Sequence, residues 1–106
     1  MLITTQDTFA DYEIVETLGL VRGNTVRARH VGNDIMASLR NLVGGEITEY
    51  TKLIAESREQ AIDRMCQRAR EIGADGIVAV RFTTSGIMQA ASELFVYGTA
   101  VRLRQR

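Results

Sequence analysis

The feature that most constrains the fold is a long amphipathic stretch that runs from about residue 46 or 48 to residue 72. Its apolar residues recur at separations of three, four or seven positions, which places them on one side of an α-helix. These residues are Ile47, Tyr50, Ile54, Ala61, Met65, Ala69 and Ile72. At 1.5 Å per residue the predicted helix is roughly 35–40 Å long, so it needs an apolar partner surface along much of that length.

The second half of this predicted helix carries two further apolar residues, Ile62 and Cys66. They widen the apolar stripe, and we therefore expect that half to be buried more deeply. Gly73 follows the last apolar position, where a glycine with positive φ often ends a helix. Residues 74–76 are expected to form the turn that follows.

The partner surface is expected to be a small antiparallel β-sheet. Residues 13–21 are rich in β-branched side chains and lead into Arg-Gly-Asn at 22–24, a typical turn signal, after which a short strand can follow at 25–29. Residues 77–84 and 93–103 are predicted to be two further strands, joined by a hairpin connection over 85–91.

A short helix is predicted between the first strand and the long helix. Asn33 or Asp34 can cap its start, and it runs to about Val43, where Gly44 and Gly45 end it. The fold class is therefore α+β, a small antiparallel sheet covered by one long amphipathic helix plus a short helix. Residues 1–106 fit a single domain.

Both faces of the predicted sheet carry apolar residues. In the strand over 77–84, Val78, Val80 and Phe82 are assigned to one face and Ile77 to the other. The long helix covers one face, and the short helix can cover only part of the second. We therefore expect another copy of the chain to bury the remainder.

Charge argues against a nucleic-acid partner. The chain has 13 basic and 13 acidic residues and no net charge, so no overall field attracts a polyanion or an anionic membrane. Nucleic-acid binding would rest on two sets of arginines, Arg22, Arg27 and Arg29, or Arg102, Arg104 and Arg106. The second set is better explained as the solubilising end of an edge strand.

The location is expected to be cytoplasmic. No apolar run approaches the roughly 20 residues of a membrane span, and the first residues lack the basic and apolar regions of a signal peptide. The chain has one cysteine, which fits a reducing compartment.

The side chains suited to metal binding are few. A soft-metal site needs several Cys or His ligands, and the chain offers His30 and Cys66 with carboxylates such as Asp34. Cys66 lies on the apolar side of the long helix, where a cysteine usually acts as a small hydrophobe. His30 and Asp34 are weak candidates, since one chain supplies too few ligands unless symmetry brings copies of His30 together.

Catalytic signatures are missing from the sequence. With one histidine and no nucleophile motif, we expect no catalytic residues and no enzymatic activity. Gly44 and Gly45 precede a helix, whose N-terminus can bind an anion, but Glu46 puts a negative charge there. The glycine pair is better explained as a hinge between two helices.

The chain resembles the YbjQ-like family of small bacterial and archaeal proteins, across nearly its whole length. The matching segments are 14–21, Asp34 to Gly45, Tyr50, Arg58 and Ala61, 73–78 and 98–101. The family commonly has a basic residue directly after the paired glycines, where this chain has Glu46. That departure puts a family anion or interface site at this position in question.

The resemblance implies a β-α-β-β fold related to the dodecin subunit, assembled as a ring-shaped homopentamer. The family is labelled as binding heavy metals, which implies a metal ion as cofactor. Arg40, Gly44, Gly45, Tyr50 and Arg58 match family positions, and we assign them to the interface or to structural contacts. The expected function is thus a non-enzymatic, self-assembling protein; the alternative is a metal or small-ligand binding module with its site at a subunit interface or ring axis.

Overall fold

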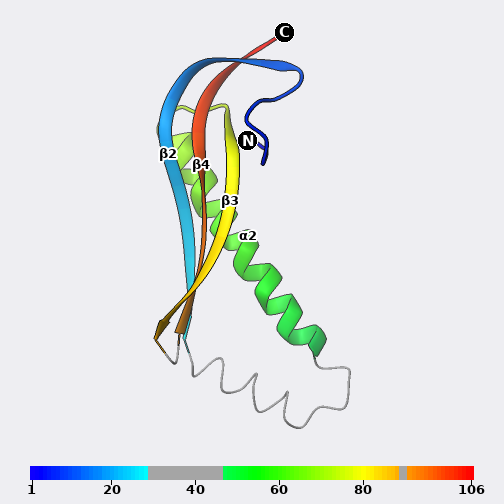
Figure 1. Ribbon diagram of the computed structural model, residues 1–106, viewed down its shortest axis with the longest axis vertical. Coiled ribbons are helices and arrows are strands. Elements are labelled where there is room, and N and C mark those ends of the chain that lie inside the picture. The colour runs from blue at the N-terminus through cyan, green and yellow to red at the C-terminus, as the bar shows by residue number, and fades with distance from the viewer. Residues whose placement is uncertain (29–46, 89–90) are drawn as a thin grey trace.

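Four strands and one helix make up the part of the chain that the computed structural model describes, residues 1–28, 47–88 and 91–106 (Figure 1). The strands are β1 (Leu2–Ile3), β2 (Tyr12–Ala28), β3 (Gly76–Met88) and β4 (Ala91–Gln105). The helix is α2 (Ile47–Glu71), and it lies against one face of the sheet. The α+β class is confirmed for this part of the chain.

The sheet has the order β1-β3-β4-β2 and is mixed rather than antiparallel. β4 pairs antiparallel with both neighbours, but β1 pairs parallel with β3. The chain after β1 continues along β3, where the Val80 amide donates to the Thr4 carbonyl at 3.0 Å. The prediction of an antiparallel sheet was wrong at this edge, because a two-residue strand has no periodicity to detect.

β2 is one continuous strand, and the predicted turn at residues 22–24 was wrong. Gly23 lies in the middle of β2, directly beneath α2. A Cβ atom at Gly23 would lie 2.6 Å from the backbone nitrogen of Met65, closer than real contacts allow. The glycine therefore permits the helix backbone to approach the strand, one of the recognised uses of a glycine inside a strand.

A β-bulge in β3 changes which side chains face the helix. Val78 pairs with Thr99 and Arg81 with Tyr97, so β3 has one more residue than β4 between these pairs. Ala79, inside the bulge, has φ of 55°. The extra residue puts Val80 on the face of Ile77, and the predicted grouping of Val80 and Phe82 with Val78 was wrong.

The hairpin of β3 and β4 is longer than predicted. Most of the connection expected at 85–91 belongs to strands, since β3 extends to Met88 and β4 begins at Ala91. The two strands pair along this length, with Ser85 opposite Glu93 and Met88 opposite Ala91.

α2 matches the predicted helix, and its second half packs most closely on the sheet. Its buried residues are Ser57, Ala61, Met65, Cys66 and Ala69. Gly73 has φ of 80°. The amide of Ala74 bonds the Ala69 carbonyl, and the amide of Gly73 bonds the Arg70 carbonyl, which together form the predicted glycine cap. Ile72, assigned to the apolar stripe, is instead 45% exposed just beyond the helix end.

The core lies between the second half of α2 and the middle of the sheet. The strands contribute Val21, Ile77, Val80, Val96 and Ala100. Two helix arginines bind the backbone of β2, since the guanidinium of Arg64 donates to the Asn24 carbonyl and that of Arg68 to the Arg22 carbonyl at 3.0 Å. These bonds fix the helix across Gly23.

Arg102 and Arg104 belong to an interior strand and Arg106 directly follows it, so the interpretation of these arginines as the end of an edge strand was wrong. β4 lies between β3 and β2. Arg102 pairs with Glu16 at 3.4 Å and Arg104 with Glu13 at 2.8 Å, both across to β2. Two of the three charges are therefore partly neutralised within the chain.

Candidate functional site

Most of the predicted site residues lie outside the described part of the chain. These are His30, Asp34, Arg40, Gly44 and Gly45. Tyr50 lies in the first turns of α2, but only its backbone is described.

The described residues include no metal centre. Within residues 1–28, 47–88 and 91–106, no three His, Cys, Asp or Glu side chains lie close enough to hold a metal ion. Cys66 is 7% exposed and belongs to the core, as predicted. Burial raises the pKa of its thiol, which disfavours the thiolate that a metal requires.

The face of the sheet that points away from α2 is the first of two surfaces that can carry function. Val21, Gly23 and Thr25 are buried beneath the helix, so Leu20 and Val26 point to the opposite side. The register places Leu20 diagonally next to Tyr97 and Val26 diagonally next to Phe95 on β4, with Arg22 opposite Tyr97 and Asn24 opposite Phe95 between them. We call these four residues, Leu20, Val26, Phe95 and Tyr97, the outer patch.

One end of this outer face is covered by the chain itself. A Cβ atom at Gly76 would lie 3.0 Å from the ring of Phe9 and 3.0 Å from Leu103, so the N-terminal segment packs over this end. Val101 and Val78 are consequently buried, with 1% and 6% exposure. The sequence predicted that the short helix and another copy of the chain cover this face, and it did not indicate the cover that the N-terminal segment provides at this end.

The outer patch lies beyond this cover. Leu20 is 69% exposed and Val26 is 51% exposed, while the rings of Phe95 and Tyr97 are half-buried. The two rings pack on each other with centroids 5.6 Å apart. Beside them, the Asn24 amide donates to the Glu93 carboxylate at 2.9 Å. An apolar surface interrupted by a few polar groups, here Arg22 and Asn24, is typical of a protein–protein interface.

The second surface is a pocket on the other face of the sheet, where α2 runs away from the strands towards its N-terminal end (Figure 1). We call it the wedge pocket. Its volume is about 380 Å³. It is lined by Arg58 of α2, Phe82, Thr83 and Thr84 of β3, and Leu94 of β4.

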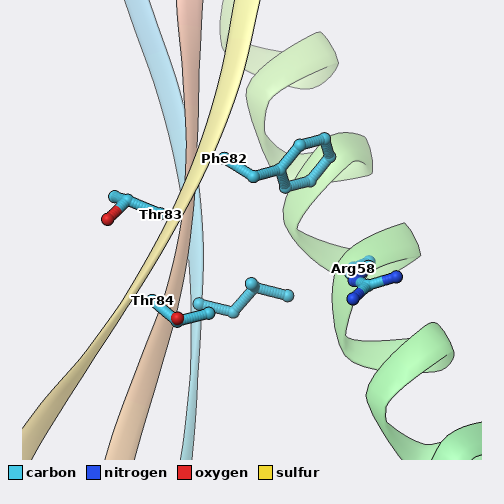
Figure 2. Close-up of a pocket in the computed structure, with 5 residues that line it drawn as sticks. Arg58, Phe82, Thr83 and Thr84 are labelled. Atoms are coloured by element: carbon cyan, nitrogen blue, oxygen red, sulfur yellow. The ribbon is translucent and has the colours of Figure 1, made fainter.

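Figure 2 shows how these side chains are arranged. The ring of Phe82 points from β3 towards the helix, whereas Thr83 points to the other side of the strand. Phe82 is 45% exposed and Leu94 is half-buried, so apolar surface remains open at the pocket. Arg58, which extends from the helix, supplies the charge among the lining residues whose side chains the structure describes.

Sequence reasoning selected Arg58 but missed its companions. Arg58 was singled out through the family resemblance, and a structural role was assigned to it. Phe82 was placed on the wrong face because the bulge at Ala79 leaves no simple sequence signal. Leu94 was not selected as a site residue, because its distance from the helix depends on the angle of α2.

Comparisons with known proteins agree with this description. Within the described residues no helix combines the length and apolar character that crossing a bilayer requires. A crystal structure of a protein of unknown function from Pediococcus pentosaceus, assigned to the DUF74 family, superposes with a TM-score of 0.64 at 19% identity and covers 98% of each chain. At that identity the likeness shows the fold alone. The class is thus a small α+β protein in which one long helix backs a mixed sheet.

The chain belongs to the YbjQ-like family, whose sequence profile, described as "Putative heavy-metal-binding", matches residues 1–104. A relative from Methanococcus vannielii, called UPF0145 protein, is 55% identical over 99% of this chain and 100% of its own length. A UPF0145 protein from Methanosarcina acetivorans is 53% identical over 100% of this chain and 100% of its own length. Another from Archaeoglobus fulgidus is 56% identical over 98% of this chain and 96% of its own length. The resemblance stated from sequence motifs is confirmed.

Proposed function

We propose that this protein is a non-enzymatic, self-assembling protein of the cytoplasm, in which the outer patch of one copy packs against a neighbouring copy. The observation that carries the proposal is the exposure of Leu20 and Val26 on an otherwise ordered sheet face. Large apolar side chains grouped on one face are typical of surfaces that another protein covers. A second copy is the partner that is always present at matching concentration.

The supporting geometry is a surface that is ready to pack. The half-buried rings of Phe95 and Tyr97 are held by the sheet, so little side-chain freedom is lost when a partner covers them. Aromatic residues of this kind are enriched at interfaces. A ring of five copies and a dodecin-like subunit remain part of the proposal and rest on the family resemblance.

The test is the mass of the assembly in solution, measured by light scattering after size-exclusion chromatography. We expect a multiple of the 11.8 kDa chain at micromolar concentration. Leu20→Glu should reduce the mass to the monomer, because a buried unpaired carboxylate is costly. Ile72→Glu is the matched control, since Ile72 is 45% exposed but lies outside the outer patch. A monomeric wild type, or an unchanged assembly in Leu20→Glu, contradicts the proposal.

A metal-binding module is the second function that we propose to test, because the family description names heavy metals. One chain supplies too few soft ligands, so the site would have to combine residues such as His30 from several copies. Metal content of the untagged protein should then be stoichiometric and should be lost in His30→Ala. Metal-free wild-type protein in an intact assembly, after growth with the metal supplied, contradicts this function.

A further inference from the structure

We infer that the wedge pocket binds a small organic carboxylate with an apolar body, held by Arg58 at the charged end and by Phe82 and Leu94 at the apolar end. This inference goes beyond self-assembly and does not depend on it. It rests on three observations, which are the isolation of the Arg58 charge, the open apolar wall, and the size of the pocket.

Arg58 carries a charge that nothing in the described part of the chain neutralises. Residues three or four positions away share its side of the helix, and in α2 these are Ile54, Ala55, Ala61 and Ile62. None is a carboxylate, and among the side chains that the structure describes, those of residues 1–26, 54–85 and 93–106, no ion pair or hydrogen bond reaches the Arg58 guanidinium.

Arg58 differs from two other arginines of the same helix in what its guanidinium faces. Arg64 and Arg68 are used to bind the carbonyls of Asn24 and Arg22 on β2. Arg58 lies nearer the N-terminal end, where the helix has moved away from the strands (Figure 1). Its guanidinium therefore faces a pocket rather than a strand backbone, and its donors are available to a ligand.

The apolar wall of the pocket comes from the two strands of the hairpin. The bulge at Ala79 turns Phe82 towards the helix, where its ring stays 45% exposed (Figure 2). Leu94 pairs with Thr84 in the register, so both lie on the same side of the sheet as Phe82. The Thr84 hydroxyl adds one group that can donate or accept a hydrogen bond.

The combination selects a chemical class. The planar guanidinium can bind both oxygens of a carboxylate at once, which strengthens and orients the contact. The wall beside it favours an aromatic or branched hydrocarbon body. The volume of about 380 Å³ lies at the lower end of the range for small-molecule sites, which suits a compact acid rather than a large cofactor.

The experiment is a titration of the full-length protein with 2-naphthoate, followed through the methyl signals of Leu94 by NMR. A ligand of this size binding with ordinary efficiency gives a dissociation constant on the order of 1 mM. We expect the Leu94 signals to shift with such a constant. Arg58→Gln should weaken binding by about 10-fold or more, the usual effect of losing a charge-assisted hydrogen bond.

Two controls make the result specific. Arg70→Gln removes an exposed charge from the same helix away from the pocket, and it should leave the affinity unchanged. The neutral isostere 2-naphthamide should bind wild-type protein at least about 10-fold more weakly than the acid, because it lacks the anionic end. The assembly mass, measured on the same samples, separates a failure here from a failure of self-assembly.

Three outcomes would overturn the inference. The first is no shift of Leu94 signals at about 10 mM, ten times the expected dissociation constant. The second is equal affinity of Arg58→Gln and Arg70→Gln. The third is equal binding of the acid and the amide, which would make the pocket a purely apolar surface.

Discussion

Replacing Gly23 with alanine is the sharpest test of how α2 is seated on the sheet. The new Cβ would overlap the carbonyl oxygen of Ala61 and would lie 2.6 Å from the backbone nitrogen of Met65, whereas ordinary contact begins at 3.4 Å. The conflict is with backbone, so no side-chain rotation relieves it. Clearing the Met65 nitrogen alone requires the helix to retreat by about 0.8 Å, and clearing the Ala61 carbonyl requires more, enough to forfeit at least a quarter to a half of the local dispersion energy.

The expected cost can be estimated from this displacement. Overpacking a core of this kind costs about 1–3 kcal/mol. The retreat also strains the bonds from Arg64 and Arg68 to β2, which are worth at most about 1 kcal/mol each because they are exposed. Alanine is favoured over glycine within a strand by about 0.5–1 kcal/mol, which offsets part of the loss. We therefore expect Gly23→Ala to lower the free energy of unfolding by about 2–3 kcal/mol.

The assay is urea unfolding followed by far-ultraviolet circular dichroism. All variants are compared at one protein concentration, because assembly makes the apparent stability depend on concentration. Thr17→Ala is the matched control, since Thr17 is exposed on the same strand outside the outer patch, and it should change stability by no more than about 0.5 kcal/mol. If Gly23→Ala is as mild as this control, the close approach of helix and strand is wrong.

Three further predictions concern the glycine cap, an ion pair and the thiol. Gly73→Ala should cost about 1 kcal/mol in the same urea assay, because φ of 80° is unfavourable for alanine, and unchanged stability would contradict the cap. The hydrogen bond and charge of Arg104 hold the pKa of Glu13 below its usual 4.5, so the stabilising effect of this pair is present above that value and is lost as pH falls through the lowered pKa. The melting temperature of the wild type should thus fall more steeply with decreasing pH than that of Glu13→Gln. Parallel plots of melting temperature against pH would rule out a stabilising role for the pair. Burial raises the pKa of the Cys66 thiol, so it should react slowly with Ellman's reagent at about pH 8 and rapidly in urea; fast reaction of the native protein would place Cys66 at the surface.

The elements that sequence reasoning predicted well are those whose cause is local. The stripe of α2 repeats over several turns, and Gly73 follows its end, so the helix and its cap could be located from neighbouring residues alone. The strands near residues 77–84 and 93–103 could also be predicted from their own β-branched and aromatic residues. The ends of these strands could not be predicted in this way, because pairing between β3 and β4 extends both strands beyond the stretches rich in β-branched residues.

The errors arise where distant parts of the chain decide the outcome. Gly23 resembles a turn residue until the helix backbone above it is known. The two-residue strand β1 is stabilised by pairing with β3, which lies more than 70 positions away in sequence. The cover that Phe9 provides over the outer face has the same long-range origin, so the sequence could not show how much of that face the chain buries.

The candidate site shows the same division. Arg58 could be selected because it matches a family position, and its apolar helical neighbours can be read directly from the sequence. The wall formed by Phe82 and Leu94 could not, since it depends on a bulge and on the angle at which α2 leaves the sheet. For a site between a helix and a hairpin, the sequence can thus indicate single residues but not that they lie together.

The bulge at Ala79 makes the length of β3 as important as its composition. Without that one extra residue, every side chain from Val80 to the end of the strand would exchange faces, because successive residues of a strand point to opposite sides. Phe82 would then leave the wedge pocket, and Arg81 and Thr83 would turn towards the helix. Deleting Ala79 should therefore disrupt the wedge pocket, although Ala79 does not line it, because the deletion turns Phe82 to the other face of the sheet.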